Sequence, residues 1–272
     1  MKTFEVKDHA PSILPEGEWE LVWSDEFDGE ELDRTKWDYR LEMMGMCWPA
    51  WTDKGVHLDG KSNAVFTLML DEEGNPVSSQ LQTGHNFMDQ PVVKTTFWDD
   101  DLQWRIGKLH ENKYLHGHGY YECYCKLQQK EGWWSAFWIQ SPVIGASLDP
   151  ADTGVEIDIM ECFGPGRISP HNVITGGYGL DMDKDSQGGM EGLDIGEYHR
   201  FGLLWDETGY TFYVDGVENG KISKFCTARP EFILISTEVR GYRFVEHKPI
   251  KEAFENAGDV FLVDHVRVFE KK

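Results

Sequence analysis

Residues 119–127 read GYYECYCKL, a stretch with the two-residue alternation of a β-strand. On an extended strand, Tyr121, Cys123 and Cys125 share one face, and Glu122 and Tyr124 point to the other. Eight further segments are equally rich in aromatic and β-branched residues, at residues 19–23, 64–70, 134–140, 155–160, 200–205, 210–214, 232–239 and 260–269. Because Gly, Asp, Asn and Pro residues separate these segments, the sequence predicts an antiparallel all-β fold.

The connections between these segments contain little helical periodicity. Asp215 and Gly216 follow one strand segment and predict a hairpin turn, and residues 249–257 predict one short helix. Two longer connections are expected to shape a site, at residues 141–154 and 180–196. Since the chain has no internal repeat or low-complexity linker, we expect residues 1–272 to form one domain, a sandwich of two sheets.

The charge balance restricts the partners of the chain. The sequence has 26 Lys and Arg residues against 48 Asp and Glu residues, a formal net charge of −22. A strongly acidic surface repels phosphate groups, so we expect neither a nucleic-acid partner nor binding to an anionic membrane. No apolar run reaches the roughly 18 residues that cross a bilayer. The 11 Trp residues favour a sugar-binding cleft, because indole rings stack on the C–H faces of sugars.

The five cysteines do not indicate a disulfide framework, because their number is odd and their spacing irregular. Cys123 and Cys125 have no second pair to complete a metal site, so we interpret them as apolar thiols of the core. The first residues of the chain lack the apolar segment of a signal peptide.

The segment GVEIDIMECFG, at residues 154–164, contains the residues that point to chemistry. Glu156 and Asp158 alternate with aliphatic residues, which places both carboxyls on one strand face and the aliphatic side chains in the core. Glu161 would point the opposite way unless one extra residue, near Ile159 and Met160, forms a β-bulge. Three acids on one face repel one another and raise at least one pKa, an arrangement from which a structural strand gains nothing.

Glycoside hydrolysis requires such a set of acids. One carboxylate acts as nucleophile and one carboxylic acid as proton donor, about 5–5.5 Å apart when the configuration is retained. A middle carboxylate can orient the nucleophile and keep the donor protonated. The Cα atoms of Glu156 and Glu161 would lie about 13 Å apart along a strand, so their side chains converge only on a concave sheet. The alternative interpretation is a solvent-facing strand with incidental acids.

An aromatic run lies just before this segment in the sequence. Alternation places Trp134 and Trp138 on one strand face, and Trp133 and Phe137 on the other. One pair is expected in the core and the other in the cleft, and the sequence leaves open which is which. We therefore count Trp133, Trp134 and Trp138 as candidates for substrate binding.

In these residues and their spacing, the chain resembles glycoside hydrolase family 16. The family signature is E-x-D-x-x-E or E-x-D-x-E, and Glu156, Asp158 and Glu161 have the spacing of the longer, bulged form. Further segments match the family in the same order along the chain, at residues 21–28, 32–37, 117–126, 134–139, 198–205, 212–216 and 263–269.

The resemblance implies a β-jelly roll with a concave cleft and a retaining mechanism that requires no cofactor. By position, Glu156 is the nucleophile, Asp158 the supporting carboxylate and Glu161 the acid/base. Family members often bind a structural calcium ion on the convex face, and Glu26 and Asp264 stand at the matching places. The alternative is that these two are ordinary solvated or turn-capping acids.

Departures from the family pattern bear on the substrate. Laminarinases often carry V-H-x-G-G after the catalytic strand, whereas the segment HNVITGGY, which begins at His171, has Ile174 at the place of that His. Glu238 resembles a Glu found in agarases and porphyranases. The remaining substrate-binding candidates are His171, Glu238, Trp48 and Trp51, with Trp98 and Trp104 as further possibilities.

The sequence therefore predicts a monomeric, retaining endo-hydrolase of a β-linked polysaccharide. We favour β-1,3-glucan slightly over a β-galactan, and transfer of the glycosyl group in place of hydrolysis stays open. The alternative from another class is a lectin-like module that binds glycan without cleaving it. The thiols favour the cytoplasm and a polymeric substrate favours secretion, so the location also stays open.

Overall fold

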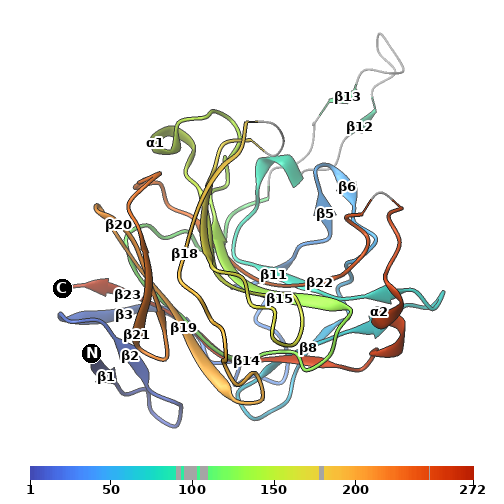
Figure 1. Ribbon diagram of the computed structural model, residues 1–272, viewed down its shortest axis with the longest axis horizontal. Coiled ribbons are helices and arrows are strands. Elements are labelled where there is room, and N and C mark those ends of the chain that lie inside the picture. Colours follow the sequence, from blue (N-terminus) through green and yellow to red (C-terminus); the bar gives the residue numbers. More distant parts are fainter. Residues whose placement is uncertain (90–92, 95–102, 105–109, 178–180, 245) are drawn as a thin grey trace.

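The structure is a computed structural model that describes residues 1–89, 93–94, 103–104, 110–177, 181–244 and 246–272. Two large antiparallel sheets lie one over the other and form a β-jelly roll (Figure 1). The predicted all-β fold is confirmed. Within the described ranges, no helix is long and apolar enough to cross a membrane.

One large sheet contains seven strands in the described part of the chain. Their spatial order is β18 (Asp183–Gln187), β17 (His171–Thr175), β16 (Glu156–Cys162), β15 (Trp133–Gln140), β22 (Phe232–Val239), β11 (Gln80–Gln82) and β4 (Asp38–Tyr39).

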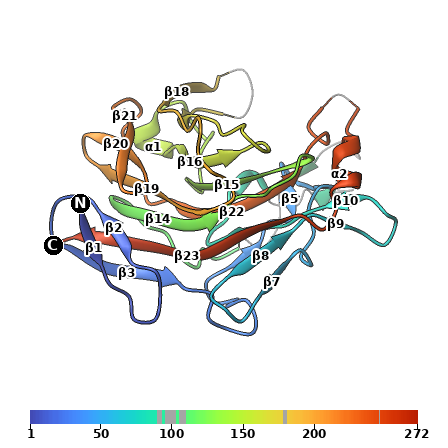
Figure 2. The ribbon, with the colours of Figure 1, turned by 60° about the horizontal axis from the view of Figure 1, so that its bottom comes forward.

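The other large sheet has eight strands in these residues, seven in one row and an eighth paired beside them. Their order is β21 (Val217–Ile222), β20 (Gly209–Val214), β19 (Tyr198–Asp206), β14 (Gly119–Lys126), β23 (Val260–Lys271), β8 (Ala64–Thr67) and β7 (Val56–Leu58), with β3 (Trp19–Asp25) paired to β23. Figure 2 shows β23 and β3 of this sheet below β15 and β16 of the seven-stranded sheet.

The remaining elements are short strand pairs and helical turns. Four are two-stranded pairs, β1 (Lys2–Phe4) with β2 (Ser12–Leu14), β5 (Glu42–Met43) with β6 (Met46–Cys47), β9 (Met69–Leu70) with β10 (Pro76–Val77), and β12 (Val93–Lys94) with β13 (Gln103–Trp104). The helical turns are η1 (Phe87–Asp89), α1 (Pro150–Thr153) and α2 (Lys251–Glu255).

The main hydrophobic core takes side chains from both sheets, which explains why their strands alternate. Cys123 and Cys125 of β14 are buried there as free thiols, as predicted. Ile157 of β16 and Phe137 of β15 reach the same cluster from the seven-stranded sheet. Burial of apolar surface between the sheets is the main stabilising term, and it leaves the alternate residues of β15 and β16 on the opposite face.

Each of the nine predicted strand segments contains a strand, although residues 64–70 divide into β8 and β9. The predicted hairpin turn joins β20 to β21, with positive φ at Asp215 (49°) and Gly216 (80°) as a tight two-residue turn requires. The predicted helix is present as α2. The loop expected at residues 180–196 was wrong in part, because it contains β18. The side chains of β18 are mostly exposed, so this strand has no hydrophobic alternation to reveal it.

The predicted bulge is present in β16. The register between β15 and β16 shifts between Phe137, opposite Met160, and Trp138, opposite Asp158. Ile159 is therefore the extra residue, and both Ile159 and Met160 are fully buried in the core. The bulge returns Glu161 to the face that carries Glu156 and Asp158.

Candidate active site

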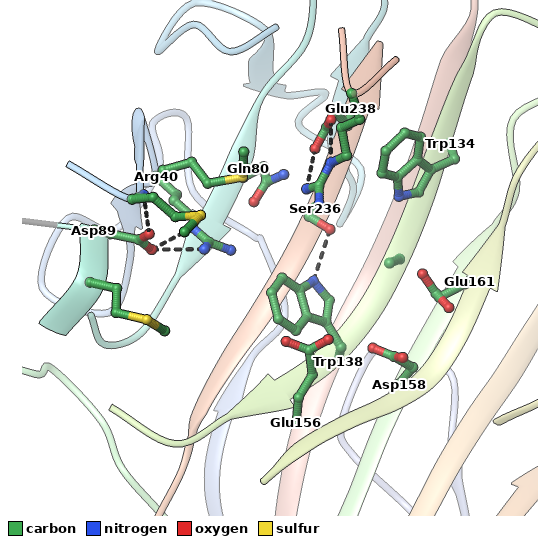
Figure 3. Close-up of a pocket in the computed structure, with 15 residues that line it drawn as sticks. Arg40, Gln80, Asp89, Trp134, Trp138, Glu156, Asp158, Glu161, Ser236 and Glu238 are labelled. Atoms are coloured by element: carbon green, nitrogen blue, oxygen red, sulfur yellow. Dashed lines mark hydrogen bonds and ion pairs between the residues drawn. The ribbon is translucent and has the colours of Figure 1, made fainter. Parts of the chain in front are cut away.

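The three acids of β16 line one cleft on the seven-stranded sheet (Figure 3). Along β15, Glu156 lies opposite Gln140, Asp158 opposite Trp138 and Glu161 opposite Ala136. These partners are alternate residues of one strand, so the acids share one face although their own spacing in sequence is uneven.

The cleft combines acids with two cations, two indoles and three thioethers. Beside the three carboxyls, its lining residues are Arg40, Met43, Met44, Gln80, Met88, Asp89, Trp134, Ala136, Trp138, Ser236, Glu238 and Arg243. They come from β5, β11, β15, β16, β22 and η1, and from the residues beside these elements, so the cleft crosses the sheet.

The electrostatics differ among the three acids. Burial, followed by the charges of Glu161 and Glu156, raises the pKa of Asp158 well above its ordinary value. Burial and the charge of Glu156 raise the pKa of Glu161 to about 7. Glu156 accepts a hydrogen bond of 2.6 Å from Gln140 Nε2. The site therefore keeps a proton on Glu161 close to neutral pH, which a general acid requires.

Asn172 of β17 was not among the sequence-predicted site residues. Its Nδ2 donates to Asp158 Oδ2 and to Glu161 Oε2, both at 3.1 Å. Asn172 lies directly opposite Asp158 in the β16–β17 register. Its polar side chain in a strand next to the acids was the available signal, but only the register shows that it touches both carboxyls.

The structure decides between the two aromatic pairs of β15. Trp134 and Trp138 line the cleft, and Trp138 Nε1 donates to Ser236 Oγ at 2.9 Å. Trp133 and Phe137 lie in the core with no exposed surface. Trp133 Nε1 donates to Asp259 Oδ2 at 3.0 Å, so the indole nitrogen is paired away from the cleft. The expectation that Trp133 binds substrate is therefore corrected.

Two more tryptophans lie behind the cleft wall. Trp51 is largely buried and stacks under the guanidinium of Arg40, 5.3 Å from its ring centroid. Trp48 packs against Trp51 at 6.2 Å between ring centroids. Arg40 itself lines the cleft and forms a buried ion pair of 2.7 Å with Asp89. Neither Trp48 nor Trp51 lines the cleft, so their expected contact with substrate is corrected: Trp51 supports Arg40, and Trp48 packs against Trp51. Trp98 lies outside the described residues, and Trp104 lies in β13.

His171 also faces away from the cleft. It is fully buried and stacks on Phe212 of β20, with 4.4 Å between ring centroids. Its Nδ1 lies 2.7 Å from the carbonyl oxygen of Ile159, the bulge residue. Burial lowers the pKa of His171 to about 4, so the ring is neutral near pH 7. His171 therefore supports the bulge from the core. The expectation that it binds substrate is corrected.

Glu238 lines the cleft, and substrate binding by this residue stays a prediction. Its buried carboxylate accepts two hydrogen bonds of 2.7 Å from Nε and Nη2 of Arg243. The Arg243 guanidinium also lies 5.4 Å from the ring centroid of Trp134. The arginine side chain is 47% exposed, so this pair presents a polar shelf to a ligand beside the indole.

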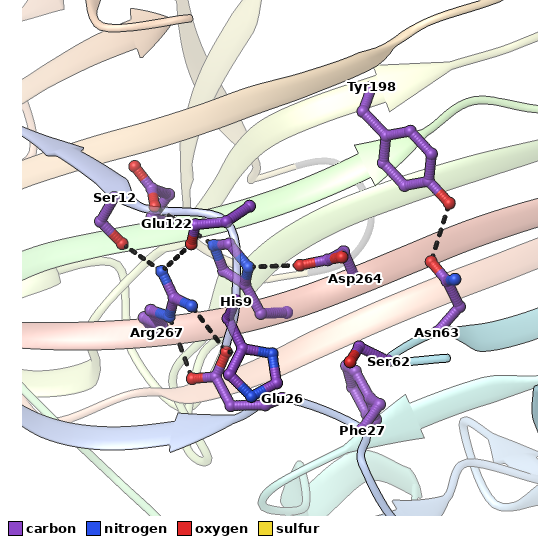
Figure 4. Close-up of polar contacts among 12 residues, drawn as sticks. His9, Ser12, Glu26, Phe27, Ser62, Asn63, Glu122, Tyr198, Asp264 and Arg267 are labelled. Atoms are coloured by element: carbon purple, nitrogen blue, oxygen red, sulfur yellow. Dashed lines mark hydrogen bonds and ion pairs between the residues drawn. The ribbon is translucent and has the colours of Figure 1, made fainter. Parts of the chain in front are cut away.

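In the part of the chain that it describes, the structure shows no set of side chains around Glu26 and Asp264, the two candidate calcium ligands, that would hold a calcium ion (Figure 4). Arg267 donates hydrogen bonds of 3.0 and 2.7 Å to the carboxylate of Glu26, so a guanidinium already balances that charge. Asp264 Oδ1 lies 2.7 Å from His265 Nδ1. Among the described residues, no group of three or more His, Cys, Asp or Glu side chains is arranged to hold a metal.

Comparison with known proteins identifies the family of this chain. The sequence matches the family described as glycosyl hydrolases family 16 over residues 50–230, a range that contains β16. It is 26% identical, over 93% of this chain, to glucan endo-1,3-beta-glucosidase A1 of Niallia circulans. This chain spans about two fifths of the length of that relative, 38%.

Two solved structures are similar in fold. One is the catalytic domain of an endo-1,3-beta-glucanase (laminarinase) from Thermotoga petrophila, with a TM-score of 0.65 and 22% identity over 94% of this chain and 99% of that one. The other comes from work on endo-acting O-glycanases of the human gut microbiota that initiate mucin breakdown, with a TM-score of 0.68 and 18% identity over 97% and 94% of the chains. Because the family match covers more than half of the sequence and includes the three carboxyls, the chain belongs to family 16 of the glycosyl hydrolases and is a glycoside hydrolase.

Proposed function

We propose that this protein is a retaining endo-β-1,3-glucanase and that residues 1–272 act as one catalytic domain. In this proposal Glu156 is the nucleophile, Glu161 the acid/base and Asp158 the supporting carboxyl. The observation that carries it is the set of three carboxyls on one face of β16, in a cleft where burial and neighbouring charge raise the pKa of Glu161 to about 7.

In the first step, a carboxylate oxygen of Glu156 attacks the anomeric carbon of the bound sugar. The glycosidic C–O bond breaks, and Glu161 gives its proton to the departing oxygen, so the leaving sugar departs as an alcohol. The anomeric carbon is now joined to Glu156 by an ester bond with inverted configuration.

In the second step, Glu161 is ionised and takes a proton from a water molecule. The water oxygen attacks the anomeric carbon, the ester bond breaks, and the Glu156 carboxylate is restored. Two inversions give net retention. A group with a pKa of about 7 serves both steps, because it can hold the proton in the first and accept one in the second.

The glucan assignment draws support from the relatives. The curated relative is named a glucan endo-1,3-beta-glucosidase, and one fold neighbour is a laminarinase. The indoles of Trp134 and Trp138 suit the C–H faces of glucose rings. We further propose that the enzyme acts as a monomer and needs no cofactor, so that dialysis against EDTA leaves its activity unchanged.

A galactose-containing glycan is the second candidate, and the Glu238–Arg243 shelf favours it. Glu238 is 1% exposed and holds Arg243, so the partly exposed guanidinium is the group of this pair that can donate to a sugar hydroxyl beside Trp134. The fold neighbour from the work on mucin-degrading O-glycanases points the same way.

A substrate panel tests the proposal. Wild-type protein and its Glu156→Gln variant are incubated with laminarin, mixed-linkage glucan, agarose, carrageenan, porphyran and host-type galactose-containing glycans, and products are read by mass. Oligosaccharides from laminarin with wild type only are the expected result. Products from a galactan alone would move the assignment to the second candidate. Binding without any cleavage would overturn the enzymatic proposal in favour of a lectin-like module.

A further inference from the structure

One amide joins two of the three carboxyls in the cleft. The Nδ2 group of Asn172 has two hydrogens, and it lies 3.1 Å from Asp158 Oδ2 and 3.1 Å from Glu161 Oε2. It also lies 3.4 Å from Ser169 Oγ, a longer contact. Asn172 is 3% exposed, so water competes little for these hydrogens.

The neighbouring strand fixes the orientation of this amide. Ser186 of β18 lies opposite Asn172 in the register, and its hydroxyl donates to Asn172 Oδ1 at 2.7 Å. Because the amide oxygen can only accept, this bond turns Nδ2 toward the carboxyls. A chain of hydrogen bonds therefore runs from β18 through β17 to β16.

Some of the groups around Glu161 raise its proton affinity, and others lower it. Burial and the charge of Glu156 favour the protonated form. Lys184 of β18 and Arg243 beyond β22 favour the ionised form, as does the hydrogen bond from Asn172. The same asparagine and Lys184 oppose the effects of burial, Glu161 and Glu156 on Asp158.

Of these groups, Asn172 is the neutral one in direct contact with both acids. We propose that Asn172 is a positioning residue that couples Asp158 to Glu161, and that Ser186 holds its amide in the orientation this requires. The proposal rests on the acid/base role assigned to Glu161. By donating to the ionised carboxyl, Asn172 makes Glu161 a stronger acid in the first step and keeps it available as a base in the second.

The test is a pH profile of kcat/KM on laminarin for wild type, Asn172→Ala, Ser186→Ala and Gln187→Ala. Gln187 is the matched control, since it is the exposed neighbour of Ser186 on β18. Loss of a donor to a carboxylate raises the pKa of that carboxyl. We expect the basic limb of Asn172→Ala to move up by about one pH unit, that of Ser186→Ala by less, and that of Gln187→Ala to stay in place.

A structural role alone would lower kcat at every pH without moving the limb. A folded Asn172→Ala with the wild-type limb would therefore overturn the proposal, whatever its rate. If Asn172→Ala does not fold, the limb of Ser186→Ala decides in the same way. Titration of the Glu161 carboxyl by carbon NMR gives an answer without turnover, so failure of the coupling is distinguishable from failure of the glucanase proposal.

Discussion

Carboxyls are buried both on β16 in the cleft and on the outer face of the eight-stranded sheet, but their pKa values are shifted in opposite directions. On the outer face, burial alone would raise the pKa of Glu26, yet the hydrogen bonds and charge of Arg267 bring it below its ordinary value. In the cleft, burial and like charge raise the pKa of Glu161 to about 7. No ion pair joins Asp158 or Glu161 to a cation among the residues that the structure describes.

The partners of the outer face explain this difference. Arg267 also donates to the carbonyl oxygen of Ala10 and lies 2.9 Å from Ser12 Oγ, and Glu122 accepts from the Ile13 amide. Those acids and bases fasten the N-terminal segment to β14 and β23 (Figure 4). The buried ion pair on the outer face stabilises the structure, whereas burial and like charge in the cleft raise the proton affinity of Asp158 and Glu161.

The largest effect is expected from the cleft. Glu156→Gln and Glu161→Gln should each lower kcat on laminarin by about 10³-fold or more, since one removes the nucleophile and the other the proton donor. Both replacements keep the shape of the side chain, so far-UV circular dichroism should match wild type. Near-wild-type turnover by either folded variant would mean that the roles are assigned wrongly.

The outer face should respond in stability and not in rate. Arg267→Met leaves Glu26 without its guanidinium, which we expect to lower the free energy of unfolding by about 3 kcal/mol. Urea unfolding measures this, and kcat of the folded fraction should stay within about twofold of wild type. Lys7→Ala, which removes a cation that is 92% exposed, is the control and should change stability by less than about 0.5 kcal/mol. A kcat that falls with Arg267→Met would break the contrast between the two regions.

Asp158→Asn tests the middle carboxyl of the cleft. The amide keeps the size of the side chain and an oxygen that can accept from Asn172, but it cannot carry a proton or a charge. We expect kcat to fall by about 10- to 100-fold with little change in KM. A rise in KM at unchanged kcat would instead assign Asp158 to substrate binding.

The smallest effect is a pH-dependent gain in stability. Because the pKa of Glu161 rises from 4.5 to about 7 on folding, the folded chain holds a proton that the unfolded chain releases. Stability is therefore lost as the pH rises through this window. Glu161→Gln should raise the melting temperature by about 2–5 °C at pH 8 and leave it unchanged at pH 4.5. An equal rise in melting temperature at both pH values would show that removal of the buried Glu161 charge is not the cause.

The sequence was sufficient for features that depend on local alternation. The nine strand segments, the bulge at Ile159 and the shared face of the three acids follow from the period of two and from the odd spacing of Glu161. The identity of the cleft-facing indoles did not follow, because alternation separates Trp133 from Trp134 without telling which side holds the core.

Contacts between distant segments also could not be predicted from the sequence. Asn172 touches Asp158 and Glu161 through the register of β17 on β16, which no local pattern encodes. The pairing of Arg40 with Asp89 joins residues on either side of β11. Likewise, Arg267 pairs with Glu26 from almost the other end of the chain, a contact that no local pattern in the sequence predicts.

The central claim is that Glu156 attacks the anomeric carbon while Glu161 moves the proton, and azide rescue tests it most directly. A Glu156→Ala variant, supplied with sodium azide and an activated β-glucoside of a laminari-oligosaccharide, leaves room for azide where the carboxylate stood. The account predicts restored turnover and a glycosyl azide of inverted, α configuration by proton NMR. A β-glycosyl azide from this variant would contradict the account, because it would identify Glu156 as the acid/base.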